Sequence, residues 1–223
     1  MLKILFYIFV IMIIICLILI IKKKVNSCNT KRFIKQYLKY DNISIDEYET
    51  GDLLFFVSKD SEVLWVPYYF THVGTIVKKN DKIYVLDADP LLKGKYLIEL
   101  EDYINKYCGN IYLFKFFWNE NDKQNILKNV NDIMNETLNI VDEASVFDLL
   151  KTIFNSHLTC VGLATKIIFG EENNIIIPDD LIIKLKDKIK YVKRIKKQDI
   201  NNDCYHYHGL FNPFTAKHII QKN

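Results

Sequence analysis

An unbroken apolar run, Ile4 to Ile21, limits what this chain can fold into more than any other feature of its sequence. The run holds 18 residues without a charge. As a helix rising about 1.5 Å per residue it would reach about 27 Å, close to the thickness of the hydrocarbon core of a bilayer. Lys22, Lys23 and Lys24 follow in place of a small-residue cleavage site, so the pattern favours an uncleaved transmembrane anchor over a signal peptide. A buried core helix fits poorly, because the segment is apolar on every face.

The basic residues that follow the run predict its orientation. They cluster from Lys22 to Lys35, and no acidic residue appears before Asp41. An excess of lysine and arginine marks the cytosolic side of a membrane segment. We therefore expect a single-pass membrane protein, with the lipid bilayer as a partner and the folded domain in the cytosol. The glycosylation sequons at Asn42 and Asn135 would then be accidental.

Charge and cysteine usage exclude several classes of protein. Residues 1–24 carry four of the 30 basic residues, which leaves 26 against 27 acidic ones. A nearly neutral remainder offers no electrostatic surface for nucleic acid, so no nucleic-acid partner is expected. Outside the apolar run the cysteines are widely spaced, without the paired pattern of a zinc ribbon or a disulfide scaffold. Cys204, His206 and His208 supply only three local ligands, so we favour a solvated tail over a metal site and expect no cofactor.

The hydrophobic pattern predicts an α+β domain with central antiparallel strands packed by helices. The strands are expected at 53–57, 71–77, 83–87, 111–117 and 190–195, and the helices at 99–107, 121–138 and 147–154, with two more that begin at 160 and 178. The chain then divides into an anchor (1–24), a juxtamembrane helix or linker (25–48), the domain (49–196) and a polar tail (197–223). The segment from Asp89 to Lys95 is expected to be a loop.

Three residues in this predicted arrangement have the side chains that a thiolate nucleophile site requires. His72 lies on a strand beside Gly74, which is expected to leave open space next to the histidine. A turn at 79–82 makes a hairpin that can bring Asp87 alongside the histidine ring. Cys160 lies where a helix starts, and both the helix dipole and a histidine partner favour the thiolate form of a cysteine. The predicted roles are Cys160 as the nucleophile, His72 as the general base and acid, and Asp87 as the residue that orients the histidine. Backbone N–H groups at the helix start are the expected oxyanion donors.

Each of these residues taken alone also fits a structural role. A single buried cysteine is more often a small apolar filler than a nucleophile, and His72 and Asp87 could be ordinary strand and turn residues. The combination and order of the surrounding motifs favour the catalytic interpretation.

Those motifs resemble a known family. Gly51-Asp52-Leu53-Leu54-Phe55, His72-Val73-Gly74, Val85-Leu86-Asp87-Ala88 and a late helical cysteine are similar to the circularly permuted papain-like amidases of the YaeF/YiiX type. This branch of the NlpC peptidase superfamily includes poxvirus members, and Pro178-Asp179-Asp180-Leu181 also resembles one of its segments. The resemblance implies a permuted papain-like domain with a catalytic histidine that precedes the cysteine. The chain departs from the family by having aspartate for the usual glutamate, and Val161-Gly162 after the cysteine in place of Ser-Glu.

We therefore expect a membrane-anchored thiol hydrolase or acyltransferase that acts on an amide or ester. The substrate could be a small molecule, a lipid-linked or acylated compound, or a peptide. The alternative is a membrane-anchored binding or structural module that keeps the same fold without activity.

Overall fold

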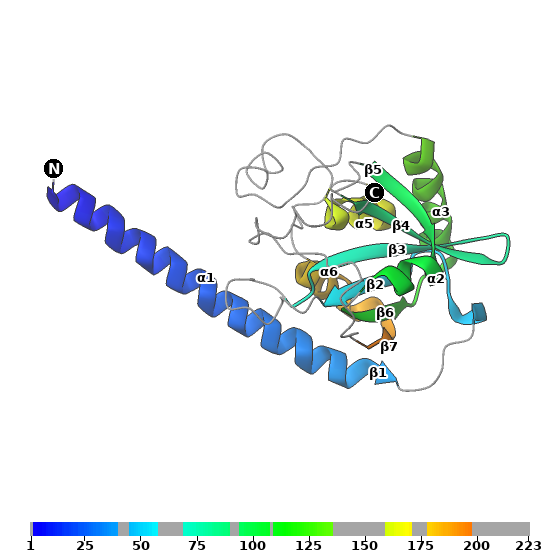
Figure 1. The fold of residues 1–223 in the computed structure, drawn as a ribbon, viewed down its shortest axis with the longest axis horizontal. Coiled ribbons are helices and arrows are strands. Elements are labelled where there is room, and N and C mark those ends of the chain that lie inside the picture. The colour runs from blue at the N-terminus through cyan, green and yellow to red at the C-terminus, as the bar shows by residue number, and fades with distance from the viewer. Residues whose placement is uncertain are drawn as a thin grey trace.

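The computed structural model describes residues 2–39, 45–57, 69–89, 94–107, 109–135, 159–170 and 178–197. These residues build a mixed α+β fold around one sheet, which confirms the predicted class (Figure 1). The sheet has the strand order β1-β7-β6-β2-β3-β4-β5, and every neighbouring pair is antiparallel except β1 and β7. The strands are β1 (Leu38–Lys39), β2 (Leu53–Val57), β3 (His72–Lys79), β4 (Lys82–Asp89), β5 (Gly94–Glu99), β6 (Asn110–Phe116) and β7 (Ile189–Lys196). The helices are α1 (Leu2–Tyr37), α2 (Leu100–Lys106), α3 (Glu120–Asn135), α5 (Cys160–Phe169) and α6 (Pro178–Leu185), with 3-10 turns η1 (Ile45–Glu47) and η3 (Lys186–Lys188).

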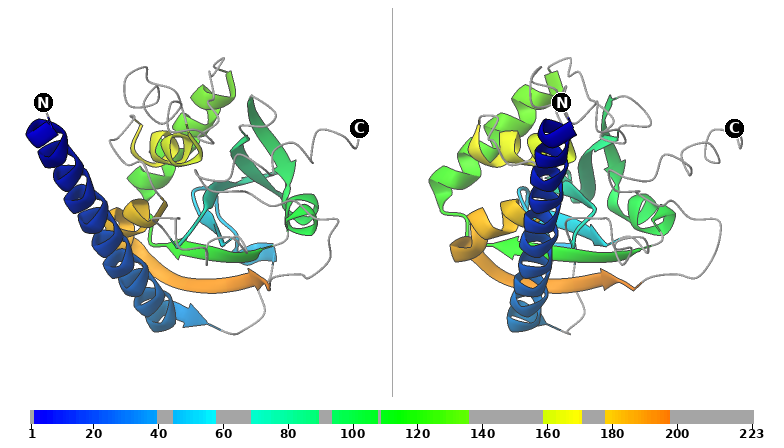
Figure 2. Two further views of the ribbon diagram at one scale, coloured as in Figure 1. Left: turned by 60° about the vertical axis from the view of Figure 1, so that its left-hand side comes forward. Right: turned by 90° about the vertical axis from the view of Figure 1, so that its left-hand side faces the viewer.

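The two faces of the sheet bury different sets of side chains, as alternation along a strand requires. Leu53 and Phe55 of β2 point into a large core that is covered by α3, α5 and α6. Leu54 and Phe56 point the other way, into a smaller core that includes Leu100 of α2. Two buried faces explain why β2 reads as a continuous apolar run. Figure 2 shows these helices gathered on one side of the curved sheet and α2 on the other.

The hairpin predicted around residues 79–82 is present. Lys79 pairs with Lys82, and the two residues between them adopt positive φ angles, 50° at Asn80 and 60° at Asp81. Two such residues in succession make the type of turn whose twist matches that of the flanking strands. Asparagine and aspartate tolerate this conformation better than most residues do. The turn therefore holds β3 and β4 in register.

Helix α1 runs without a break through the predicted anchor and most of the juxtamembrane segment. Near its end, Ile34 is buried, and Phe33 and Tyr37 pack against the larger core. The short strand β1 then pairs with β7, so the last turns of α1 are attached to the domain. Among the residues that the structure describes, no helix meets the length and hydropathy that a membrane crossing requires.

One predicted loop is wrong in part. Residues 94 and 95 belong to β5, which pairs with β4 along the edge of the sheet. Gly94 and Lys95 are weak strand formers, and it is the hydrogen bonding to β4 that makes them extended. The helix predicted at 147–154 and the tail after residue 197, including Cys204, His206 and His208, lie outside the described residues.

Candidate active site

His72 and Asp87 are joined by a short hydrogen bond inside the domain. His72 is the first residue of β3, and its Nε2 lies 2.7 Å from Oδ1 of Asp87 on β4. The antiparallel register, with Thr75 opposite Leu86, places Asp87 one pair further along and diagonal to His72. The two residues are only 3% and 1% exposed. The hairpin thus holds an acid against the ring of the histidine, away from water.

Cys160 completes the group from a distant part of the sequence. It is the first residue of α5, and its helix start is fixed by Thr159, whose hydroxyl accepts the N–H of Gly162 at 2.9 Å. The side chains of Cys160 and His72 are hydrogen-bonded to each other. Cys160 is partly exposed, unlike its two partners. The structure therefore brings the three residues singled out in the sequence into one site with access to solvent.

The electrostatics of the site favour a protonated imidazole. Burial alone opposes a positive charge on the His72 ring. The Asp87 carboxylate and the Cys160 sulfur attract that charge, and both also accept hydrogen bonds from the ring. The attraction prevails, so the pKa of His72 is raised well above its usual value of 6.5. An imidazolium held between a carboxylate and a sulfur is the state expected of a thiolate–imidazolium pair.

Tyr103 is a fourth member of the site that sequence reasoning missed. Its hydroxyl, on α2, donates to Oδ2 of Asp87, the oxygen that His72 does not use. Phe56 packs its ring 5.4 Å from both the His72 and the Tyr103 ring centroids. The spacing of Leu100, Tyr103 and Tyr107 signals a buried face, but nothing in that spacing names Asp87 as the partner. Both carboxylate oxygens are thus held, which fixes the position of the acid.

The role predicted for Gly74 is wrong in one respect. A Cβ at residue 74 would lie 2.6 Å from Cγ1 of Val85, so the space beside this glycine is already filled. Real atoms do not approach this closely, so a side chain here would force the Val85 side chain to move. Gly74 therefore allows close packing behind the histidine, and it leaves no opening for a substrate.

Asp179 anchors the chain just before His72. The N–H groups of Tyr69 and Phe70 each donate to its Oδ2 at 3.1 Å, and the Thr30 hydroxyl donates to Oδ1 at 2.9 Å. Burial is the main influence and raises the pKa of this carboxyl to about 6, although these hydrogen bonds oppose the shift. The helix start predicted at Pro178 is confirmed. Beyond that helix start, the structure shows that Asp179 ties α1 and α6 to the segment just before β3.

The first turn of α5 also supplies hydrogen-bond donors. Helix geometry leaves the N–H groups of Cys160 and Val161 without intrahelical acceptors. Within the described part of the chain, neither group is seen to donate a hydrogen bond. These two donors beside the sulfur could receive an oxyanion. Among the same described residues, no group of three or more histidine, cysteine, aspartate and glutamate side chains could hold a metal ion.

Comparisons with known proteins give a structural likeness but no family. No protein-family model and no curated protein matches the chain. A crystal structure of the metalloprotein YiiX from Escherichia coli O157:H7 matches with a TM-score of 0.42 and 14% sequence identity. The match covers 68% of this chain and 98% of that protein. A likeness at this level assigns neither a family nor an activity, so membership in the permuted papain-like amidases stays a prediction.

Proposed function

We propose that this chain is a cysteine-dependent hydrolase or acyltransferase with a circularly permuted papain-like domain, which cleaves an amide or an ester. One observation carries the proposal: His72 is hydrogen-bonded to both Asp87 and Cys160. Cys160 is also partly exposed at a helix start, where a substrate carbonyl can reach the sulfur. A protein that used these side chains only for packing would have no need of a charged pair beside an accessible thiol.

The reaction follows from the order of the contacts. The Cys160 thiolate attacks the carbonyl carbon, and the N–H groups of Cys160 and Val161 stabilise the resulting oxyanion. The His72 imidazolium gives its proton to the leaving amine or alcohol, which leaves a thioester on the sulfur. Water, or a second alcohol or amine, then attacks the thioester while His72 accepts its proton. The acyl group departs as an acid, ester or amide, and the thiolate–imidazolium pair is restored.

Asp87 and Tyr103 act by holding the histidine in position. The Asp87 carboxylate stabilises the imidazolium that exists before His72 gives up its proton and again after it accepts one. Tyr103 occupies the second carboxylate oxygen, so Asp87 cannot rotate away from the ring. The shorter side chain of aspartate, compared with the glutamate usual in the resembling family, still reaches His72 at 2.7 Å.

An acylation assay tests this proposal. The full chain, in lipid nanodiscs, is mixed with a p-nitrophenyl ester, and the release of nitrophenolate and the mass of the protein are followed. We expect one acyl group per chain on Cys160 in the wild type and in Cys28→Ser, because Cys28 has no histidine partner among its described contacts. Cys160→Ala should acquire no acyl group and keep the wild-type melting temperature within a few degrees. Equal acylation of Cys28 and Cys160, or none on either, would instead favour the inactive binding module.

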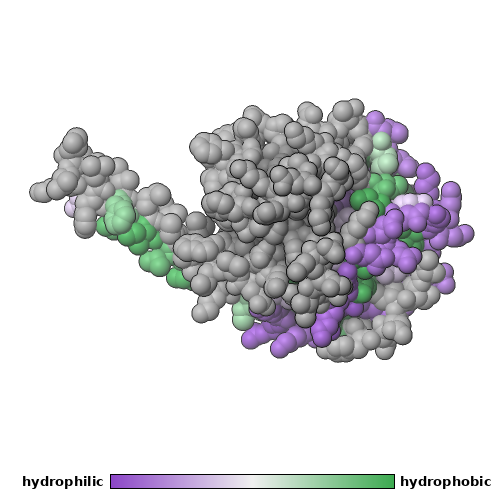
Figure 3. All heavy atoms as spheres, in the orientation of Figure 1, coloured by the Kyte–Doolittle hydropathy of each residue, from purple (hydrophilic) through white to green (hydrophobic). Residues whose placement is uncertain are grey.

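The proposal includes attachment to a membrane through α1, with the domain on the cytosolic side. Nine large apolar side chains between Tyr7 and Val25 are 44% to 66% exposed. Figure 3 shows apolar residues along the part of α1 that projects from the domain. Exposed apolar surface of this extent is typical of a site that meets lipid or another protein. An anchor there would concentrate the enzyme where acylated and lipid-linked substrates are found.

Vesicle flotation of the full chain tests the attachment. Lysine at Ile14 and Ile18 should release the protein from vesicles, because each charge costs about 2.5–3.5 kcal/mol at the centre of a bilayer. Ile183→Lys is the matched control, since Ile183 is also exposed but lies on α6. Equal release by both changes would contradict attachment through α1. Glycosylation at Asn42 or Asn135 in a cell would contradict the cytosolic orientation.

A further inference from the structure

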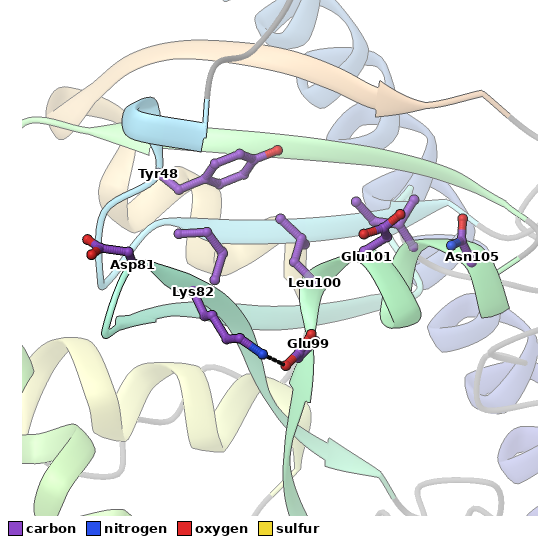
Figure 4. A pocket seen from close by; sticks show the side chains of 9 residues that line it. Tyr48, Asp81, Lys82, Glu99, Leu100, Glu101 and Asn105 are labelled. Atoms are coloured by element: carbon purple, nitrogen blue, oxygen red, sulfur yellow. Dashed lines mark hydrogen bonds and ion pairs between the residues drawn. The ribbon is translucent and has the colours of Figure 1, made fainter.

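A pocket lies on the face of the sheet that bears the smaller core, and none of the three predicted site residues lines it. It has a volume of about 360 Å³ and is formed where the β3–β4 turn, the start of α2 and Tyr48 meet (Figure 4). This size falls within the range of roughly 300–1,000 Å³ that is usual for small-molecule sites. The lining residues are Tyr48, Asp81, Lys82, Ile83, Glu99, Leu100, Glu101, Ile104 and Asn105.

The floor of the pocket is apolar. Ile83 and Leu100 are 6% and 9% exposed and belong to the smaller core, and Ile104 packs against the same core. The floor is therefore rigid, and it offers aliphatic surface to whatever enters.

The rim carries an excess of negative charge. Asp81, Glu99 and Glu101 supply three carboxylates, and Lys82 is the single positive side chain among the lining residues. Nζ of Lys82 lies 2.6 Å from Oε1 of Glu99, so these two charges balance each other. Within the described part of the chain, Asp81 and Glu101 form no ion pair. Because no metal-binding group exists among the described residues, the charge at this rim suits an organic cation better than a metal ion.

Tyr48 adds a polar group that has no hydrogen-bond partner among the described residues. Its side chain is 8% exposed, and its hydroxyl makes no hydrogen bond to any described residue. Figure 4 shows the ring lying across the pocket, with the hydroxyl directed toward the side where Leu100 and Glu101 stand. Burial, and then the nearby Glu47 and Asp52, raise the pKa of Tyr48 to about 12, so the hydroxyl keeps its proton near neutral pH. The ring is thus buried while the hydroxyl stays accessible at the pocket, where a ligand can pair with it.

We propose that this pocket binds a small organic amine, with its apolar stem on Ile83, Leu100 and Ile104 and its ammonium group between Tyr48 and Glu101. The ammonium group donates to the Tyr48 oxygen and to the Glu101 carboxylate, and the stem covers the aliphatic floor. The site is separate from the thiol site. It uses the face of α2 that bears Glu101 and Asn105, whereas Tyr103 of the same helix turns toward Asp87.

Methyl NMR on the full chain in nanodiscs tests the proposal with three probes of similar shape. They are 2-phenylethylammonium, 2-phenylethanol and 3-phenylpropanoate, with empty nanodiscs as the blank. The ammonium probe should shift the methyl signals of Ile83 and Ile104 and leave that of Ile126, in the opposite core, unchanged. We expect it to bind at least threefold more tightly than the alcohol, and the carboxylate to bind more weakly than both. Equal affinity for the three probes, or no shift at Ile83 and Ile104, would overturn the proposal.

Conservative variants separate the contributions of the charges and the hydroxyl. Glu101→Gln should weaken binding of the ammonium probe about two- to threefold, as expected for an exposed ion pair. Asp81→Asn is the matched control, because it removes a charge at the other end of the pocket and asparagine suits the turn, so it should weaken binding less than Glu101→Gln does. Tyr48→Phe should weaken it about fivefold through the lost hydrogen bond. Tyr48→Phe should not lower the melting temperature, because the hydroxyl bonds to none of the residues that the structure describes. A lower melting temperature, or unchanged affinity, for Tyr48→Phe would contradict the assigned contact.

Discussion

Two buried carboxylates, Asp52 just before β2 and Asp87 on β4, each pair with a basic side chain, and the two pairs differ in their surroundings. Oδ2 of Asp52 lies 2.7 Å from Nζ of Lys115, and Oδ1 of Asp87 lies 2.7 Å from Nε2 of His72. The side chain of Asp52 is 0% exposed and that of Lys115 is 4% exposed, so this pair is as deep as the other. Oδ2 of Asp52 also accepts the backbone N–H of Glu49, which fixes the turn before β2. Asp87, in contrast, is linked through His72 to a partly exposed thiol.

The difference indicates that burial of a charge pair does not by itself mark a functional site. Among the described residues the partners of Lys115 are the carboxylates of Asp52 and Glu49, and no thiol or hydroxyl adjoins it. The histidine of the second pair contacts a thiol, a side chain that becomes nucleophilic when it loses its proton. We therefore interpret Asp52–Lys115 as structural and Asp87–His72 as catalytic.

The same substitution at the two carboxylates should separate these roles most clearly. Asp52→Ala should lower the free energy of unfolding by about 3–5 kcal/mol, because it leaves Lys115 buried without its partner. Asp87→Ala should cost less, about 1–3 kcal/mol, because His72 can become neutral. Urea denaturation of both variants measures the losses. The double variant Asp52→Ala/Lys115→Met should recover part of the loss, and a larger loss for Asp87→Ala than for Asp52→Ala would contradict the comparison.

The pH dependence of stability should show that burial disfavours the charged form of Asp52 in the Asp52–Lys115 pair. Burial raises the pKa of Asp52 from 3.8 to about 6, even though Lys115 opposes the shift. Between these values the folded state holds a proton that the unfolded state has lost, so stability from this group falls as pH rises. At about 1.36 kcal/mol per pKa unit, the fall reaches up to about 3 kcal/mol. Asp52→Asn should lack this contribution, so its stability relative to the wild type should rise between about pH 4 and pH 6. A constant difference between the two proteins across this range would contradict the assignment.

Tyr103→Phe should have the smallest effect and sharpen the role of Asp87. It removes the donor to Oδ2 of Asp87 but keeps the ring that packs on Phe56. We expect a loss of about 1 kcal/mol in stability and a few-fold loss in the acylation rate of Cys160, because Asp87 gains freedom to rotate. A change in stability without any change in rate would mean that Tyr103 supports only the fold.

The sequence predicted the parts of the structure that depend on local pattern. The turn at Asn80 and Asp81, the apolar strand β2 and the helix starts at Cys160 and Pro178 are all recognisable from residue types and spacing. The pairing of His72 with Asp87 follows from the hairpin, because its register is set by a two-residue turn.

Contacts between distant segments could not be predicted in this way. The hydroxyl of Tyr103 and the backbone clamp made by Asp179 depend on where α2 and α6 dock, and spacing along the chain does not encode that. Strand β5 is extended because β4 lies beside it. The lack of space for a side chain at residue 74 depends on how tightly Val85 packs against it, and a single glycine in the sequence does not reveal that.

Alkylation of Cys160 as a function of pH tests the central claim most directly. Near pH 6 an ordinary thiol, with a pKa of about 8.5, is only about 0.3% thiolate and reacts slowly with iodoacetamide. Because Asp87 and the sulfur keep His72 protonated, we expect Cys160 to be labelled at least tenfold faster than the exposed Cys28, with both sites followed by mass spectrometry. His72→Ala should remove this advantage, and Asp87→Ala should reduce it less. Equal labelling of Cys160 and Cys28 near pH 6, unchanged by His72→Ala, would contradict an activated thiol.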